Sequence, residues 1–235
     1  MPTKYIRWDG EWVEVATAES DADGLPEEDL FAHYDLSDES DDDGDSISSL
    51  EDHSGNGRVA EAVGSPVFEQ DALNNNEPGA VLDGDGDGFH VESDDWGTLE
   101  QPYTVYAVVD LYEATDSHRV FDSEENGRII MDYSDTDGWR IFADDDHIEG
   151  TDDESINVVT GVYDGEDSLL KEGGFQTASG DPGSGTLGDL PIGFYEGAED
   201  NWWDGAISEI VVYDARHDSE TRDQVNDYLS DKWGL

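Results

Sequence analysis

Three aspartates alternate with glycines in the segment 83–88, which reads Asp-Gly-Asp-Gly-Asp-Gly. Alternating carboxylates supply the hard oxygen ligands that Ca²⁺ prefers, and this spacing opens the calcium loop of an EF-hand. The rest of that loop is missing, because Glu92 lies two positions early and Asp94 stands at the twelfth position. We expect either a calcium site at Asp83, Asp85 and Asp87 or a solvated turn, and the abundance of aspartate in the chain favours the turn.

Four aromatic residues stand near glycine- and aspartate-rich turns, where loops would meet the rim of a binding site: Trp96, Trp139, Tyr195 and Trp202. Aromatic rings bind sugars because the apolar face of a pyranose stacks on the ring. The alternative for each ring is packing in the core or between subunits. Trp202 is the strongest candidate, because strand alternation separates it from its neighbour Trp203.

The chain of 235 residues carries 62 acidic and 10 basic residues, a formal net charge of −52. Such a chain could be disordered, but 35% hydrophobic residues and seven tryptophans indicate a packed core. Adaptation to molar salt explains the charge, since a Debye length of about 3 Å at 1 M salt leaves surface carboxylates little mutual repulsion. The scarcity of lysine and arginine argues against nucleic-acid binding. The chain has no cysteine, which excludes disulfides and a cysteine nucleophile.

Short β-rich runs separated by glycine- and aspartate-rich turns predict an antiparallel sandwich or barrel. The expected strands cover residues 30–35, 103–110, 120–121, 128–131, 139–142, 157–163, 190–195 and 207–212. One helix follows the last strand, because Asp218 or Ser219 can cap it and Val225, Leu229 and Lys232 recur at helical spacing.

The C-terminal sequence carries a family resemblance. Residues 203–213 read Trp-Asp-Gly-Ala-Ile-Ser-Glu-Ile-Val-Val-Tyr, Ser-Glu-Thr-Arg follows at 219–222, and Lys-Trp-Gly stands at 232–234. This pattern resembles the signature of the concanavalin A-like lectin/glucanase (laminin G-like) superfamily, and weaker similarity extends over roughly residues 28–235. The resemblance implies an all-β, antiparallel jelly-roll β-sandwich (concanavalin A-like) with a short C-terminal helix. It also implies that Trp203 is a core residue, which turns Trp202 outward.

Glucanases of this superfamily carry Glu-x-Asp-x-x-Glu on a strand, where two carboxylates act as nucleophile and acid/base. No glutamate of this chain begins the complete pattern. Glu69 and Glu92 start it, but Asn74 and Gly97 stand where the third carboxylate belongs. The histidines and serines form no recognisable triad sequence. We therefore expect a chain without enzymatic activity, and a glucanase-type carbohydrate-active enzyme is the alternative.

Residues 1–20 form a predicted unit of their own, because Asp9-Gly10 between two β-rich runs is typical of a two-residue hairpin turn. An isolated β-hairpin is marginally stable in water. We therefore expect Tyr5, Trp8 and Trp12 of this N-terminal β-hairpin to pack on a partner and serve assembly. Residues 21–27 form a linker and residues 28–235 the laminin G-like β-sandwich. The opening also resembles small virion proteins from tailed viruses of haloarchaea.

Together these features predict a lectin-like virion surface protein, a capsid turret, decoration or fibre protein, of a haloarchaeal tailed virus. No apolar run approaches the about 18 residues of a membrane span, and no secretion signal opens the sequence. We expect synthesis in the host cytoplasm and display on the particle. The expected partners are further copies of the chain in a trimer or pentamer, other virion structural proteins and host surface glycans. The alternative without a ligand is a purely structural decoration protein, and calcium is the one cofactor that the sequence suggests.

Overall fold

The structure is a computed structural model that describes residues 4–8, 11–15, 24–37, 42–115, 117–124, 127–155, 157–195 and 201–235, the first two ranges by their backbone alone. The described elements, in chain order, are β1 (Lys4–Trp8), β2 (Glu11–Val15), β3 (Leu30–Asp35), β4 (Ser49–Leu50), β5 (Ala60–Val63), β6 (Val67–Glu69), β7 (Gly79–Asp83), β8 (Gly88–Val91), α1 (Ser93–Trp96), β9 (Tyr103–Leu111), β10 (Ser117–Ser123), β11 (Ile129–Ser134), β12 (Gly138–Ala143), β13 (His147–Glu149), β14 (Val158–Tyr163), the 3₁₀ turn η1 (Gly165–Asp167), β15 (Ser168–Glu172), β16 (Phe175–Gly180), β17 (Leu190–Ile192), β18 (Asp204–Tyr213) and α2 (Ser219–Lys232).

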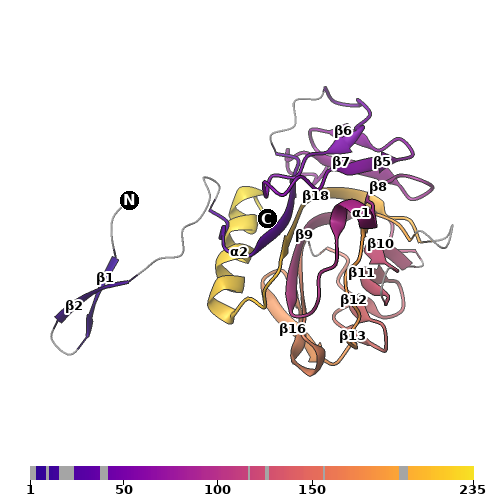
Figure 1. The fold of residues 1–235 in the computed structure, drawn as a ribbon. Coiled ribbons are helices and arrows are strands. Elements are labelled where there is room, and N and C mark those ends of the chain that lie inside the picture. The colour runs from indigo at the N-terminus through magenta and orange to yellow at the C-terminus, as the bar shows by residue number, and fades with distance from the viewer. Residues whose placement is uncertain are drawn as a thin grey trace.

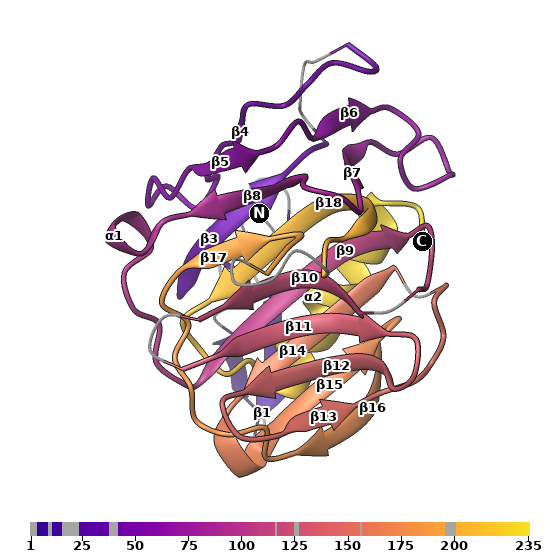
Figure 2. The same ribbon diagram turned by 90° about the vertical axis from the view of Figure 1, so that its right-hand side faces the viewer.

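Two antiparallel sheets lie face to face and enclose the main hydrophobic core (Figures 1 and 2). The first sheet has the strand order β13-β12-β11-β10-β17-β8-β5-β4. The second has the order β16-β15-β14-β9-β18-β7-β6, and β3 also pairs with β18. This arrangement confirms the predicted all-β sandwich with a C-terminal helix. The sequence prediction did not include the short helix α1.

Strand β9 is apolar along nearly its whole length because both of its faces are buried. Val105 and Val109 point into the core between the sheets. Tyr106 and Val108 point to the opposite face, where they pack in a second cluster with Leu229 of α2. A strand that is covered on both sides shows a continuous apolar run instead of an alternation, and this explains why β9 was the clearest strand in the sequence.

Helix α2 lies along the outer face of the second sheet (Figure 1). The Asp218 carboxylate accepts a hydrogen bond from the backbone N–H of Thr221 at 2.9 Å, which confirms the predicted N-cap. Leu25 and Trp233 are fully buried in the cluster under the helix. Leu25 belongs to the predicted linker 21–27, so at least one residue of that segment is part of the folded unit.

Strands β1 and β2 pair with each other, with Lys4 opposite Val15, as predicted for a hairpin. The predicted turn Asp9-Gly10 lies outside the described residues, and so do the side chains of Tyr5, Trp8 and Trp12. The division into 1–20, 21–27 and 28–235 stays a prediction. Among the described residues, no helix is long and apolar enough to cross a membrane.

Candidate functional site

A hollow of about 850 Å³ opens at one edge of the sandwich, where the end of β7, the start of β10, the β11–β12 turn and the start of β18 meet. These segments are far apart in the sequence and are brought together by the two sheets. The lining residues are Asp83, Gly84, Asp85, Thr115, Ser117, His118, Ser134, Asp135, Thr136, Asp137, Arg140, Asn201, Trp202 and Asp204. Hydroxyl, amide and carboxylate groups dominate this list, and Trp202 is its aromatic member.

The Trp202 indole is half-buried at the wall of the hollow. Phe194 stacks on it with ring centroids 5.0 Å apart and an interplanar angle of 18°. The turn at Gly193 places Phe194 there, since its φ of 81° suits glycine and an added Cβ would lie 2.2 Å from Leu82 Cδ1. Trp203 is fully buried, as predicted. The predicted alternation therefore holds, and Trp202 is a supported aromatic platform.

His118 forms part of the wall beside Trp202. Its Nδ1–H donates a hydrogen bond to the Trp202 carbonyl oxygen at 2.8 Å. With the proton on Nδ1, a neutral imidazole presents Nε2 as a hydrogen-bond acceptor. His118 is only 7% exposed, and Nε2 has no hydrogen-bond partner among the residues that the structure describes. A buried acceptor without a partner is costly, so this atom is a candidate contact for a ligand.

Two carboxylates of the hollow come from paired strands. Asp83 and Asp204 stand directly opposite each other on the paired strands β7 and β18. Partial burial, followed by the charges of Glu113 and Asp83, raises the pKa of the Asp204 carboxyl above its ordinary value, and only His118 opposes this. Like charges opposite each other on neighbouring strands are unfavourable, so fold stability does not explain this pair.

Next to the hollow, three arginines neutralise buried carboxylates on the outer face of the first sheet. Arg119, Asp132 and Arg140 lie in register on β10, β11 and β12 and form ion pairs across the strands. Arg128 binds both oxygens of Asp122 at 2.9 and 2.6 Å. Burial still raises the pKa of Asp122, although Arg128 and Arg119 counteract it. Sequence reasoning missed this network, because its members come together only through the strand register.

Two of the predicted ligand-binding aromatics are core residues instead, so their predicted position at a rim is corrected. Trp139 and Trp96 are both fully buried. Trp139 lies on the inner face of β12, and its Nε1–H donates to the carbonyl oxygen of Asp153 at 3.1 Å. Trp96 Nε1–H donates to the carbonyl oxygen of Leu187 at 3.2 Å. Both residues stand near turns in the sequence, but their rings pack in the hydrophobic core.

Tyr195 is half-buried and does not line the hollow. Its hydroxyl donates to Glu124 Oε1 at 2.7 Å, and the Arg128 guanidinium lies 4.2 Å from the centre of its ring. One face of this ring is therefore already covered by a cation.

The three aspartates of the predicted calcium loop do not converge. Asp83 and Asp85 line the hollow, and the Asp83 carboxylate accepts the backbone N–H of Asp85 at 2.9 Å. Asp87 instead accepts the backbone N–H of Ser65 at 2.6 Å. Calcium binding at this loop stays a prediction, without a set of ligands gathered around one point.

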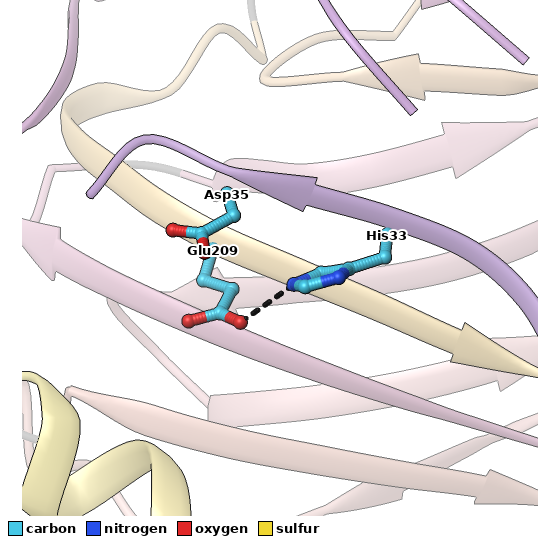
Figure 3. A group of neighbouring side chains, drawn as sticks. All are labelled: His33, Asp35 and Glu209. Atoms are coloured by element: carbon cyan, nitrogen blue, oxygen red, sulfur yellow. Dashed lines mark hydrogen bonds and ion pairs between the residues drawn. The ribbon is translucent and has the colours of Figure 1, made fainter. Parts of the chain in front are cut away.

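Another group gathers the types of side chain that bind metals. His33 and Asp35 on β3 and Glu209 on β18 place ligand atoms within 4.8 Å of one another (Figure 3). Within the described ranges no other group of this kind occurs. Glu209 Oε1 lies 2.7 Å from His33 Nε2 (Figure 3). The Lys232 ammonium, however, already lies 2.5 Å from Asp35 Oδ2 and 2.9 Å from Glu209 Oε2. The cluster therefore contains its own cation and fastens the end of α2 to the sheet.

No protein-family model and no curated protein sequence matches the chain, but solved structures share its fold. Trypanosoma rangeli sialidase in complex with sialic acid is 15% identical, with a TM-score of 0.58, and the match covers 99% of this chain and 36% of that chain. Domain 4 of AbnA, a GH43 extracellular arabinanase from Geobacillus stearothermophilus, in complex with arabinotriose, is 19% identical, with a TM-score of 0.59 and coverages of 85% and 97%. The Ruminococcus gnavus IT-sialidase CBM40 bound to α2,3-sialyllactose is 14% identical, with a TM-score of 0.51 and coverages of 63% and 96%.

At these identities the likeness shows the fold alone, a β-sandwich consistent with the concanavalin A-like superfamily that the C-terminal sequence suggested. The chain spans about a third of the length of the sialidases. The prediction that the chain is not an enzyme is contradicted, because its neighbours include sialidases and a domain of an arabinanase, which are enzymes. An enzymatic relation therefore stays open. The incomplete Glu-x-Asp-x-x-Glu pattern excluded one arrangement of carboxylates, not catalysis in general.

Proposed function

We propose that the protein binds carbohydrate in the hollow at Trp202. The observation that carries this proposal is a half-buried indole, supported from one side by Phe194, in a wall that is otherwise polar. A sugar ring needs both an apolar surface for its C–H face and polar groups for its hydroxyls. The volume of about 850 Å³ falls within the roughly 300–1,000 Å³ of ligand-binding clefts. The neighbours support the proposal, since two of these sandwich domains are described as bound to arabinotriose and to sialyllactose.

Replacing Trp202 by alanine should weaken binding of the best oligosaccharide at least tenfold, because one aromatic anchor often contributes about 2 kcal/mol to a small interface. The melting temperature should change little, since the ring is half-buried. Binding is measured by calorimetry in about 2 M KCl, where surface charges are screened, after a panel of immobilised oligosaccharides has identified the probe. The panel includes arabinotriose and α2,3-sialyllactose.

The matched control is Phe175→Ala. Phe175 is 77% exposed on strand β16 and does not line the hollow, so its removal deletes an aromatic ring elsewhere on the surface. This variant should bind like the original protein. Equal binding by both variants would show that the hollow is not the site. Failure of the original protein to bind any oligosaccharide would favour the alternative of a structural component without a ligand.

We further propose that the protein works in molar salt on the surface of a virus particle, as a homo-oligomer that contacts host glycans. The support comes from the formal net charge of −52 and from the N-terminal strand pair β1–β2. A two-stranded hairpin gains stability when it packs on a partner, which suits a docking segment. Many copies on one particle would convert weak sugar contacts into avidity.

Deleting residues 1–23 should leave the sandwich folded and change its assembly. Leu25 is fully buried under α2, so the deletion should end before it. The shortened chain should keep a cooperative melting transition but show a smaller oligomer by light scattering, and it should be absent from purified particles. An unfolded product would mean that the hairpin belongs to the sandwich. An unchanged oligomer would show that residues 1–23 do not serve assembly.

A further inference from the structure

The hollow at Trp202 is rich in carboxylates, which accept hydrogen bonds. Five of its lining residues are aspartates: Asp83, Asp85, Asp135, Asp137 and Asp204. Ionised carboxylates only accept hydrogen bonds. In its neutral form, His118 offers Nε2 as a further acceptor without a partner among the described residues, since the single ring proton on Nδ1 bonds to the Trp202 carbonyl oxygen. A ligand that satisfies these atoms must bring O–H or N–H groups.

Among the described lining residues the one guanidinium is that of Arg140, and it is not available to an acidic ligand. Arg140 Nη1 donates to Asp137 Oδ2 at 3.0 Å, and Arg140 Nε donates to Asp132 Oδ1 at 3.1 Å. Its side chain is 16% exposed. Recognition of a carboxylate normally uses a free arginine fork, which supplies two parallel N–H donors. In this hollow that fork is already engaged by the protein's own carboxylates.

We infer that the hollow selects sugars that carry no negative charge, either neutral oligosaccharides or sugars with a free amine, and excludes sialic, uronic and sulfated sugars. This inference rests on the proposed carbohydrate binding and names its ligand class. The Asp83–Asp204 pair enforces the exclusion through direct contact, so it acts even where salt screens longer-range repulsion. The His118 Nε2 atom accepts a ligand hydroxyl or amine.

The test compares matched sugars on one panel at neutral pH in about 2 M KCl. Lactose is paired with α2,3-sialyllactose, and N-acetylated chito-oligosaccharides are paired with their deacetylated, amine-bearing forms. The wider panel holds neutral, sulfated and uronic oligosaccharides. Neutral or amine-bearing binders should exceed their acidic counterparts in affinity by at least about tenfold, which corresponds to roughly 1.4 kcal/mol.

The variant Asp83→Asn/Asp204→Asn should reduce this discrimination by bringing acidic sugars closer to their neutral partners. The control variant is Asp144→Asn/Asp145→Asn, which changes the net charge equally at two exposed positions outside the hollow. Asp144 has a φ of 79°, a conformation that asparagine tolerates. The control should discriminate as the original protein does.

Two further variants test His118. His118→Asn can keep the hydrogen bond to the Trp202 carbonyl oxygen but removes the acceptor at Nε2, so it should bind the best neutral sugar about tenfold more weakly. His118→Gln places an amide oxygen near Nε2 and should recover part of that affinity. Melting curves establish that both variants are folded. Equal binding by the original protein and both variants would show that His118 is not part of the site.

The outcomes separate the two proposals. Binding of acidic sugars as tight as that of neutral ones would overturn the inferred ligand class and leave carbohydrate binding intact. An effect of the Asp144→Asn/Asp145→Asn control equal to that of the Asp83→Asn/Asp204→Asn variant would show a general charge effect and also overturn the inference. Failure to bind any sugar on the panel would overturn the proposed function itself.

Discussion

In dilute buffer the protein is expected to lose its cooperative unfolding transition, and in molar KCl it is expected to regain it. The chain has 62 acidic residues against 10 basic ones, and several of the basic residues already neutralise buried carboxylates such as Asp122 and Asp132. The exposed carboxylates therefore repel one another without compensation. At about 50 mM salt the Debye length exceeds 10 Å, whereas at 1 M it is about 3 Å. Circular dichroism melts over a series of KCl concentrations measure the effect.

A charge-reduced variant provides the control for this salt effect. Asp144, Asp145 and Asp146 form an exposed acidic run after β12. Replacing all three by asparagine removes charge without removing volume, so the variant should fold at a lower KCl concentration if electrostatic repulsion is the cause. A full transition of the original protein at about 50 mM KCl would contradict the expectation of a fold adapted to molar salt.

The second large effect concerns Lys232 at the end of α2. Its ammonium pairs with Asp35 and Glu209, whose side chains are 7% and 0% exposed. Trp233 Nε1–H also donates to Glu209 Oε2 at 2.5 Å. Lys232→Met leaves two buried carboxylates without their cation, which should lower the free energy of unfolding by about 3–5 kcal/mol. Chemical denaturation in about 2 M KCl measures the loss.

Lys171→Met is the matched control. Lys171 Nζ lies 2.6 Å from Asp223 Oδ1, but the Asp223 side chain is 65% exposed, so water can solvate it once the lysine is gone. That variant should lower the free energy of unfolding by only about 1 kcal/mol. The double variant Lys232→Met/Glu209→Gln should recover part of the stability, because it removes one of the two uncompensated charges. Equal losses in the Lys232 and Lys171 variants would contradict the role of the buried cluster.

The pH dependence of this cluster follows from two pKa shifts. Burial acts to raise the pKa of Asp35, but the Lys232 ammonium and the Ser37 backbone amide outweigh it and hold the pKa below 3.8. Burial acts to lower the pKa of Lys232, but Glu209 and Asp35 outweigh it and hold the pKa above 10.5. The contribution of Asp35 to the free energy of unfolding is therefore present above pH 3.8 and is lost on acidification. The contribution of Lys232 is present below pH 10.5 and is lost as the pH rises.

Local patterns in the sequence were sufficient to identify the elements that have a long apolar run or a clear cap. Strand β9 is apolar on both faces, and α2 has a capping aspartate followed by helical spacing, so both were predictable. The short strands β4, β5, β8 and β13 were not. Each has two to four residues, and such short segments show no readable period.

The candidate site was likewise predictable only where neighbouring residues decide the position of a side chain. The family resemblance predicted that Trp203 is buried, and alternation between neighbours then predicted that Trp202 is not. Both residues stand directly before β18, so this prediction needed only adjacent positions of the sequence. Applied to Trp139 and Arg140, the same alternation could have placed Trp139 inside, but its position beside a turn favoured the rim.

Only the tertiary structure decided which groups meet. Asp83 lies beside Asp204, Arg140 beside Asp132, and His118 beside Trp202. The first two pairs depend on strand register within one sheet, and the third depends on how the chain before β18 packs against β10 of the other sheet. Register and packing between elements are not encoded in any single segment. The sequence by itself determined an antiparallel fold of short strands, a capped terminal helix and an acidic surface, because those features depend on composition and on neighbouring residues. Its family resemblance selected the sandwich over a barrel.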